Sequence, residues 1–393
     1  MNTASSQQLY QDVTILTKDK YLLSARVYEP STTSAQHGNK KTAIVGSAIG
    51  VKMNFYHDFA CFLQHNGYRV VLFDYRGCYE SRNLLYNKYN QHLPPTDLIS
   101  WGKFDIPSVI DYVEQLDLVV GPFENSNKNC DHSNTKESGT VMSDIVFIAH
   151  SISGKSICFT PKKYLEKISA MVCVASQSGN FTHQTHILSK MLFFFVCYLF
   201  CPVMTPMVNT LPIWTMPSDC AKQCAQCGRY SEEVFGAFPK ETIDLQQYLN
   251  CPVLFYALRH DILGDAAAVK FIFNYFTNNN MKDYQPLHEP TSKIGHRDYR
   301  TVTEVLADRS NLYHFLHHFI YLNRSLGKRL GHFGFFKKHK GMNSGVWHHL
   351  LTFIDNAVER KRRDRDSSIG TASPDSSTTF NHTSLPPLRH SKL

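Results

Sequence analysis

The sequence predicts an α/β protein built on a mostly parallel, doubly wound sheet, with an N-terminal antiparallel hairpin and an inserted helical cap. Three observations support this prediction. Short apolar or β-branched runs alternate with longer helical patterns along much of the chain. The first two strand-like runs are separated only by the polar residues 17–20, which favours a hairpin. After them, the strand–helix alternation is typical of a parallel sheet with crossover helices.

Seven segments have the pattern of a strand, and four have the pattern of a helix between strands. The strand candidates are residues 13–16, 22–28, 42–45, 69–73, 144–148, 170–174 and 252–257. The helix candidates are residues 55–66, 104–115, 154–165 and 266–277. Residues 312–322 also have a helical pattern, within a segment that interrupts the repeat.

The 393 residues are enough for one large α/β domain with insertions. The predicted parts are a flexible N-terminus (1–9), a first core segment (10–180) with a polar insertion (122–142), a helical cap (181–240), a second core segment (241–360) with an insertion (278–329), and a disordered, basic, Ser-rich tail (361–393). The tail prediction rests on its content of Ser, Thr, Pro and charge, with almost no aromatic residues.

The net charge of +8 is concentrated toward the C-terminal end, in residues 337–340 and 360–363. A basic end can contact nucleic acid or anionic lipid. Charge alone reports mainly on solubility and non-specific binding, so we interpret these runs as a solvated face and a loose tail. We expect no nucleic-acid partner.

The cysteines and the N-terminus predict a cytoplasmic protein. The eleven cysteines are scattered singly, often inside apolar stretches, which is typical of reduced, buried thiols. No secretory signal is visible at the N-terminus. The most apolar stretch, residues 191–208, is interrupted by Pro202 and Pro206, and its unbroken part is shorter than the roughly 20 residues of a membrane span. Weak peripheral membrane contact, through the apolar cap or the basic tail, is the minority interpretation.

Three cysteines, Cys220, Cys224 and Cys227, invite a metal-site interpretation that their spacing does not favour. A structural zinc site needs four ligands, usually in two tight pairs, and no fourth ligand has a usual spacing here. Helical spacing on a cap helix explains the cluster better. We therefore expect neither a metal nor an organic cofactor.

Ser151 is the candidate nucleophile, because it lies between a strand-like run and a helical pattern. A tight strand-to-helix turn presents a serine hydroxyl at the carboxyl end of a sheet, and the flanking residues must be small. Ala149 and Ser153 occupy the positions that are glycines in the G-x-S-x-G pattern, and Gly154 follows. The segment alone fits a nucleophile and a helix-capping serine equally well.

A serine nucleophile needs a histidine base and a carboxylate that orients this base, in the chain order serine, acid, histidine. Asp261 follows the strand candidate 252–257 and is the first choice of acid. Asp265 is the second choice, although its position suggests a helix cap. Two histidines that follow glycine compete for the role of base, His296 and His332. The apolar surroundings of His332 favour it.

Two backbone N–H groups are candidates for stabilising a tetrahedral oxyanion. The residue after the nucleophile supplies one donor in such turns, here Ile152. The loop after the third strand, residues 46–51, should supply the second, and its small residues suit a close approach to substrate. We assign that donor to Ile49.

Taken together, several motifs resemble a known family, the predicted serine hydrolases of the α/β-hydrolase superfamily that are related to the serine aminopeptidase and monoglyceride lipase group. The matching motifs are AIGV (48–51), NGYRV (66–70), FDYRG (73–77), HSISG (150–154), ASQSG (175–179) and GHFGFF (331–336). The resemblance implies a triad of Ser151, Asp261 and His332, and selects His332 over His296. The family's paired acidic motif appears here with a single carboxylate, Asp261.

These observations predict a serine hydrolase that acts by acyl transfer, an esterase or lipase-like enzyme on an apolar acyl ester. The apolar cap segments 191–195, 199–200 and 204–207 are expected to line a pocket for the acyl group. Peptide and amide substrates remain open. The alternative is a catalytically inactive hydrolase fold that serves as a binding or membrane-surface module. A third hypothesis is nucleic-acid binding through the basic C-terminus.

Overall fold

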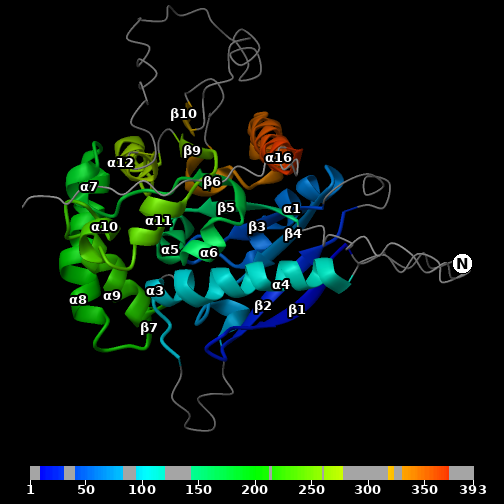
Figure 1. Cartoon of the computed structure of the whole chain (residues 1–393). Helices are drawn as coiled ribbons and strands as arrows, with labels where there is room; N and C mark the ends of the chain where they lie inside the picture. Colours follow the sequence, from blue (N-terminus) through cyan, green and yellow to red (C-terminus); the bar gives the residue numbers. More distant parts are fainter. Residues whose placement is uncertain are drawn as a thin grey trace, which may run out of the picture.

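The computed structural model describes residues 9–30, 40–82, 94–119, 143–211, 215–258, 261–277, 317–322 and 330–370. Within these residues, an eight-stranded sheet has the order β1-β2-β4-β3-β5-β6-β9-β10 (Figure 1). β2 pairs antiparallel with β1 and with β4, and the other neighbours pair parallel. The predicted fold class, a mostly parallel sheet with an N-terminal antiparallel hairpin, is confirmed.

The seven predicted strands are found, each within two residues of its predicted ends. The strands of the sheet are β1 (Gln11–Leu16), β2 (Leu22–Tyr28), β3 (Lys41–Gly46), β4 (Tyr68–Phe73), β5 (Asp144–His150), β6 (Ile168–Val174), β9 (Val253–Leu258) and β10 (His317–Leu322). A short hairpin outside the sheet contains β7 (Thr210–Leu211) and β8 (Met216–Pro217).

β10 corrects one prediction. Residues 317–322 form a strand that pairs in parallel with β9, not the end of a helix. The sequence HHFIYL is rich in aromatic and β-branched side chains, which favour a strand when a neighbouring strand edge is free. A short apolar run of this kind fits the helical period and the strand period alike, so its pattern does not distinguish them. The rest of residues 278–329, including His296, and all of residues 122–142 lie outside the described residues.

Helices cover both faces of the sheet, and successive residues of a strand point to opposite faces. They are α1 (His57–His65), α3 (Leu98–Ser100), α4 (Ile106–Val119), α5 (Ser153–Ser156), α6 (Lys162–Leu165), α7 (Ile187–Phe194), α8 (Cys201–Met204), α9 (Ser218–Cys227), α10 (Val234–Ala237), α11 (Ile243–Tyr248), α12 (Ala266–Thr277), α14 (Gly331–Gly334), α15 (Lys338–Gly341) and α16 (Val346–Gly370). Short 3-10 turns are η1 (Met53–Tyr56), η2 (Tyr79–Ser81), η4 (Ile157–Phe159) and η5 (Phe181–His183), and π-helical turns are η3 (Trp101–Asp105) and η6 (Phe195–Phe200).

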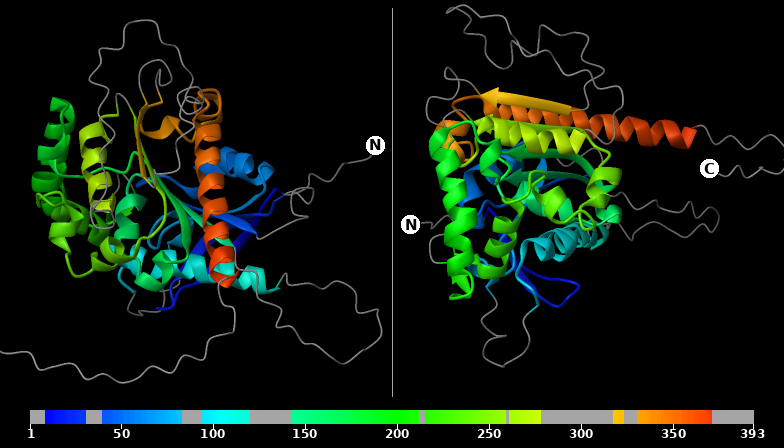
Figure 2. Two further views of the ribbon diagram at one scale, coloured as in Figure 1. Left: turned by 45° about the horizontal axis from the view of Figure 1, so that its top comes forward. Right: turned by 90° about the vertical axis from the view of Figure 1, so that its left-hand side faces the viewer.

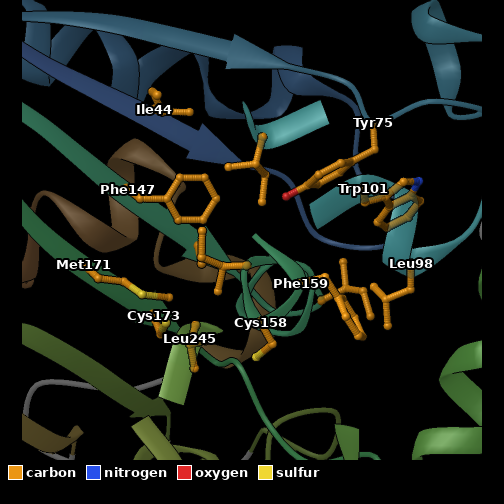
Figure 3. Packing of buried hydrophobic residues seen from close by; sticks show 14 of the residues in the cluster. Ile44, Tyr75, Leu98, Trp101, Phe147, Cys158, Phe159, Met171, Cys173 and Leu245 are labelled. Carbon is orange, nitrogen blue, oxygen red and sulfur yellow. The ribbon is translucent and has the colours of Figure 1, made fainter. Parts of the chain in front are cut away.

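The alternation of side chains divides the core into two layers. Ile44 of β3 packs in the layer that contains α4 and α12, whereas its neighbours Ala43 and Val45 pack in the layer that contains α1 and α16. Figure 3 shows the first layer, in which the rings of Tyr75 and Trp101 stack at 4.5 Å between centroids. The fully buried strands explain why their sequences read as continuous apolar runs.

Two helix predictions need correction, and both concern proline. The predicted helix 154–165 is broken into α5, η4 and α6, because Pro161 forces Thr160 into an extended conformation. Conversely, Pro202 does not interrupt the cap helix: α7, η6 and α8 run on continuously, and Pro202 lies in the first turn of α8, directly after a π-helical turn. Within the described residues, the run Ile187–Met204 is the one helix long and apolar enough to cross a membrane, and 17% of it is buried.

The predicted disorder from residue 361 is wrong for the first ten residues, which continue α16 to Gly370. Their basic side chains have specific partners. The Lys361 ammonium group donates to the carbonyl oxygens of residues 166, 167 and 168. Arg362 and Arg365 both form ion pairs with the buried carboxylate of Asp144 at the start of β5. Part of the basic run therefore fastens α16 to the sheet.

Candidate active site

Ser151 lies on a tight turn between β5 and α5. Its backbone φ is +55°, in the left-handed region that a residue other than glycine rarely adopts. The N–H of Ser151 donates to the carbonyl of Val174 at the end of β6 (2.9 Å), and its carbonyl accepts from the N–H of Gly154 (3.1 Å). A strained serine at the end of a central strand is the geometry of a nucleophile turn rather than of an ordinary helix cap.

The turn tolerates Ser153 because the chain has a glycine opposite it. A β-carbon on Gly46 would lie 2.7 Å from the Ser153 hydroxyl oxygen. Position 46 therefore carries the glycine that makes room for the side chain at position 153. The Ser153 hydroxyl donates to the carbonyl of Ser47 (2.7 Å) and accepts from the Tyr75 hydroxyl (3.0 Å). The missing glycine at position 153 is thereby compensated, and its hydroxyl is committed to the loop after β3.

Gly154 cannot be replaced in the same way. A β-carbon there would lie 2.4 Å from both the β-carbon and the hydroxyl oxygen of Ser176. The helix after the turn therefore packs directly against the segment that follows β6.

Asp261 and His332, 71 residues apart, form a buried pair. The Nδ1 atom of His332 lies 2.8 Å from an Asp261 carboxylate oxygen, and the two side chains are 7% and 1% exposed. The other carboxylate oxygen accepts the N–H of Leu263 (2.9 Å). A carboxylate that accepts the hydrogen of Nδ1 leaves Nε2 free to accept a proton, which is the arrangement of a general base and its orienting acid.

His150 connects this pair to the serine turn. Its Nε2 lies 2.9 Å from the carbonyl oxygen of His332, and its Nδ1 lies 2.8 Å from the Tyr56 hydroxyl. A carbonyl oxygen only accepts, so Nε2 carries the hydrogen and Nδ1 accepts from Tyr56. The Tyr56 oxygen in turn accepts the N–H of Ala48 in the loop after β3 (2.8 Å).

The His150 ring is held in its neutral form. Complete burial, together with the neighbouring His332, lowers the pKa of His150 well below its ordinary value of 6.5. The ring therefore serves as a fixed link and not as a proton carrier at neutral pH. Sequence reasoning used His150 only as part of the HSISG motif and missed Tyr56, because no local spacing indicates a contact across 94 residues.

The structure brings Asp261 and His332 together, but within the described residues no hydrogen bond joins the Ser151 hydroxyl to His332. The link between the two segments runs through His150, the chain neighbour of Ser151, whose Nε2 donates to the carbonyl oxygen of His332 (2.9 Å) and whose ring lies 5.1 Å from that of His332 between centroids. Catalytic hydrogen bonds are often long before substrate binds.

The two predicted oxyanion donors are not used elsewhere in the described part of the chain. Neither the N–H of Ile152 nor that of Ile49 donates to another described residue. Ile152 directly follows Ser151, and Ile49 lies in the loop after β3, next to Ala48, whose own N–H is bound to Tyr56. Their roles stay predictions.

Asp265, the second candidate acid, has a structural role. Its carboxylate accepts the N–H of Ala267 in the first turn of α12 (3.0 Å), as expected of a helix cap. It also accepts the backbone N–H groups of Thr185 and His186, which ties the start of the cap to α12. Partial burial acts to raise the pKa of Asp265, but these hydrogen bonds together stabilise the ionised form more strongly, and the pKa is lowered.

The cysteine cluster lies on one helix, since Cys220, Cys224 and Cys227 all belong to α9. Within the described residues, no group of three or more His, Cys, Asp or Glu side chains is arranged to hold a metal ion.

Several of the apolar cap side chains that were expected to line a pocket lie on the surface instead. Met191 is 62% exposed, Phe195 51%, Leu199 52% and Met207 74%, so these side chains form an outer surface. The prediction failed because a helix that is apolar on most of its circumference gives no sequence signal for which side faces the domain. The apolar side chains beside the candidate triad are instead Phe55 and Phe333, whose rings meet edge to face at 6.3 Å.

Comparison with known proteins gives likenesses of structure only. No known family model matches the sequence, and no curated protein sequence matches it either. A brefeldin A esterase, a bacterial homologue of human hormone-sensitive lipase, is 12% identical with a TM-score of 0.48, over 92% of this chain and 80% of that one. An esterase from Exiguobacterium antarcticum is 11% identical (TM-score 0.45; 88% and 100% covered), and one from Pyrococcus furiosus is 12% identical (TM-score 0.46; 90% and 96% covered). The function proposed for this chain therefore rests on the geometry of its own residues.

Proposed function

We propose that the protein is a serine hydrolase that cleaves carboxylic esters by acyl transfer, with Ser151 as nucleophile, His332 as general base and Asp261 as orienting acid. The observation that carries this proposal is the buried Asp261–His332 pair, 2.8 Å between oxygen and Nδ1, fixed beside a strained serine turn. A serine with φ of +55° costs the fold about 1–3 kcal/mol in backbone strain, and such strain clusters at functional sites. The buried histidine–carboxylate pair next to it therefore supports a catalytic role for this serine.

In the proposed reaction, Nε2 of His332 takes the proton of the Ser151 hydroxyl while the Ser151 oxygen attacks the ester carbonyl carbon. The N–H groups of Ile152 and Ile49 stabilise the negative charge on the carbonyl oxygen. The protonated His332 then gives its proton to the leaving alcohol, and an acyl-enzyme forms. Water repeats the sequence, which releases the carboxylic acid and restores Ser151.

The residues around the triad favour an ester with an apolar acyl group. Phe333 directly follows the base and is 37% exposed, its ring meets that of the partly buried Phe55, and Ile49 of the loop after β3 is also partly buried. Apolar side chains at the mouth of a site bind an acyl chain by removing it from water, at about 25 cal/mol per Å² of buried surface.

The test is steady-state hydrolysis of p-nitrophenyl esters of graded acyl length. We expect Ser151→Ala and His332→Ala each to lower kcat by about 10⁴-fold or more, and the double variant to lose no more than either single variant, because triad residues act as a unit. Asp261→Asn should cost about 10³- to 10⁴-fold. Well-folded wild-type protein without activity on any ester would instead favour an inactive hydrolase fold that acts as a binding module.

A further inference from the structure

Half of the large apolar side chains that are exposed in the described residues come from one short segment of the cap, residues 187–207. We name these nine side chains the apolar ridge. They are Ile187, Leu188, Met191, Phe194, Phe195, Tyr198, Leu199, Val203 and Met207, with exposed fractions from 38% to 74%. Single exposed apolar residues are normal on a protein surface, but a contiguous group of this kind marks an interaction site.

The ridge follows one continuous helical run, α7, η6 and α8, which forms the outer edge of the molecule (Figures 1 and 2). Its members recur at spacings of three and four residues and cover a broad arc of the helix. Aromatic rings contribute to it, since Phe194 stacks on Tyr198 at 5.1 Å and Phe181 meets Tyr198 edge to face at 5.9 Å. The ridge is thus the outer face of a helix, with aromatic side chains along it.

The opposite side of the same helix is fastened to the domain. Cys197 and Cys201 are buried, and the Cys197 thiol donates to the carbonyl of Gly179. The Arg229 guanidinium donates two hydrogen bonds to the carbonyl of Cys197, which lies in the π-helical turn (3.0 and 2.8 Å). A helix that crossed a membrane would have to break these contacts, and they favour a helix that lies along a membrane surface with its outer side facing the lipid.

The charges around the ridge suit a phospholipid surface. Residues 181–211 contain no Asp or Glu, and Lys190 is the one Lys or Arg among them. Arg229, at the end of α9, is exposed and lies over the ring of Tyr198 at 5.7 Å. The surface therefore meets anionic headgroups with little repulsion and with cations at its margin. By contrast, the basic end of α16 points away from this edge (Figure 2).

We propose that the apolar ridge docks the cap on the surface of a phospholipid bilayer, with the helix parallel to the membrane plane. A broad apolar arc that includes Phe and Tyr is typical of helices at membrane interfaces. A second copy of the chain is a weaker fit, because protein interfaces have a polar, charged rim, whereas residues 181–211 contain no Asp or Glu and a single Lys. The proposal does not depend on hydrolysis, since no triad residue belongs to the ridge.

The test is flotation of the full-length protein with vesicles of phosphatidylcholine containing about one quarter phosphatidylglycerol. The ridge variant is Met191→Gln/Phe195→Gln/Leu199→Gln, at three exposed positions. A matched control, Leu16→Gln/Leu118→Gln/Ile243→Gln, changes three exposed apolar residues of other elements, 63%, 62% and 47% exposed. We expect the ridge variant to bind vesicles at least about tenfold more weakly than wild type, and both the control and Ser151→Ala to bind like wild type.

Three outcomes would overturn the proposal. Wild-type protein could fail to float with vesicles, the ridge variant could bind as strongly as wild type, or the control variant could lose binding to the same extent. Sedimentation velocity distinguishes the other occupant of the ridge. Concentration-dependent self-association that the ridge variant abolishes, without vesicle binding by wild type, would assign the ridge to a second copy of the chain. Loss of ester hydrolysis in Ser151→Ala with vesicle binding intact would separate this inference from the proposed function.

Discussion

His150 is the residue that joins three segments of the candidate site. Through its two ring nitrogens it contacts the carbonyl of His332 and the hydroxyl of Tyr56, and Tyr56 in turn holds the N–H of Ala48. The serine turn, the short helix α14 that carries the base, and the loop after β3 are therefore fixed relative to one another by a single neutral imidazole. Such positioning contacts decide whether a catalytic geometry is held closely enough to react.

The depressed pKa of His150 predicts a pH dependence of stability. Burial keeps the folded-state ring neutral, whereas the ring of the unfolded chain takes up a proton near pH 6.5. Below that pH the unfolded state binds more protons, so stability is lost as the pH falls. In His150→Gln this loss is absent, and the stability gap between wild type and variant should narrow by about 1.4 kcal/mol between about pH 7.5 and about pH 5.5.

Urea unfolding of both proteins at the two pH values measures this gap. Because the variant carries the other titrating groups unchanged, their contributions cancel in the comparison. A gap that stays constant or widens at the lower pH would show that His150 is protonated in the folded state.

Gly264 predicts a second effect at the residue scale, because its missing side chain makes room for the acid. A β-carbon there would lie 2.6 Å from the Asp261 carboxylate oxygen that binds His332, and 3.3 Å from Ala175. Gly264→Ala should displace this carboxylate and lower kcat by about 100-fold, since a misplacement of about 1 Å has that effect. Ester hydrolysis and the melting temperature are measured together. Unchanged kcat in a stable variant would remove Asp261 from the mechanism.

The sequence could predict Ser151, Asp261 and His332 as candidates, because each follows a recognisable strand or a glycine-containing motif in the right chain order. It could not predict Tyr56 or the compensation of Ser153 by Gly46. Those contacts join residues 94 and 107 positions apart, and only the packed sheet brings them together.

At the scale of elements, a buried ion pair connects the helix after the serine turn to the cap. The Lys155 ammonium group lies 2.7 Å from the Glu233 carboxylate, with side chains 8% and 0% exposed. Although burial opposes its charge, the Glu233 carboxylate raises the pKa of Lys155 above its ordinary value. Glu233 also accepts the N–H of Gly179 and has a φ of +56°, so the cap segment is held in a strained conformation by this contact.

A double-mutant cycle on this pair tests the connection. Lys155→Met and Glu233→Leu each leave one buried charge without its partner and should each destabilise the fold by about 3–5 kcal/mol. The double variant should lose at least about 2 kcal/mol less stability than the sum of the two single variants. The exposed pair Lys162–Glu166, 3.7 Å apart and about half exposed, is the matched control and should show a coupling below about 0.5 kcal/mol. Equal coupling energies for the two pairs would contradict a stabilising role for the buried ion pair between α5 and the cap.

The elements show where prediction from local pattern succeeds and where it stops. The ends of the strands that are buried on both faces were predicted to within two residues. Both faces of such a strand carry apolar side chains, so the sequence shows a continuous apolar run. β10 was assigned to a helix because the short run HHFIYL fits either period. Pro161 and Pro202 have opposite effects: the residue before Pro161 is extended and ends its helix, whereas Pro202 lies in the first turn of α8, directly after a π-helical turn, and the helix continues.

At the scale of the whole molecule, the C-terminal residues 331–370 hold the base of the candidate site in place. Phe335 and Phe336 pack with α1 and α16, and the Trp347 indole N–H donates to the carbonyl of Phe335 (2.6 Å). Phe336 also lies 4.7 Å from the His150 ring between centroids. The short helix α14, which carries His332, is therefore held by α16, and ion pairs fix α16 to Asp144 at the other end of β5. The alternating pattern predicted this sheet, but not the partners of α16.

The central claim, that Ser151 is an activated nucleophile, is tested most directly by labelling the folded protein with a fluorophosphonate and locating the adduct by mass spectrometry. We expect a single adduct on Ser151 that is lost in Ser151→Ala. The neighbouring Ser153→Ala is the matched control and should keep the label, since its hydroxyl is bound to Ser47 and Tyr75. An adduct on another serine, or no adduct on well-folded protein, would contradict the proposed function.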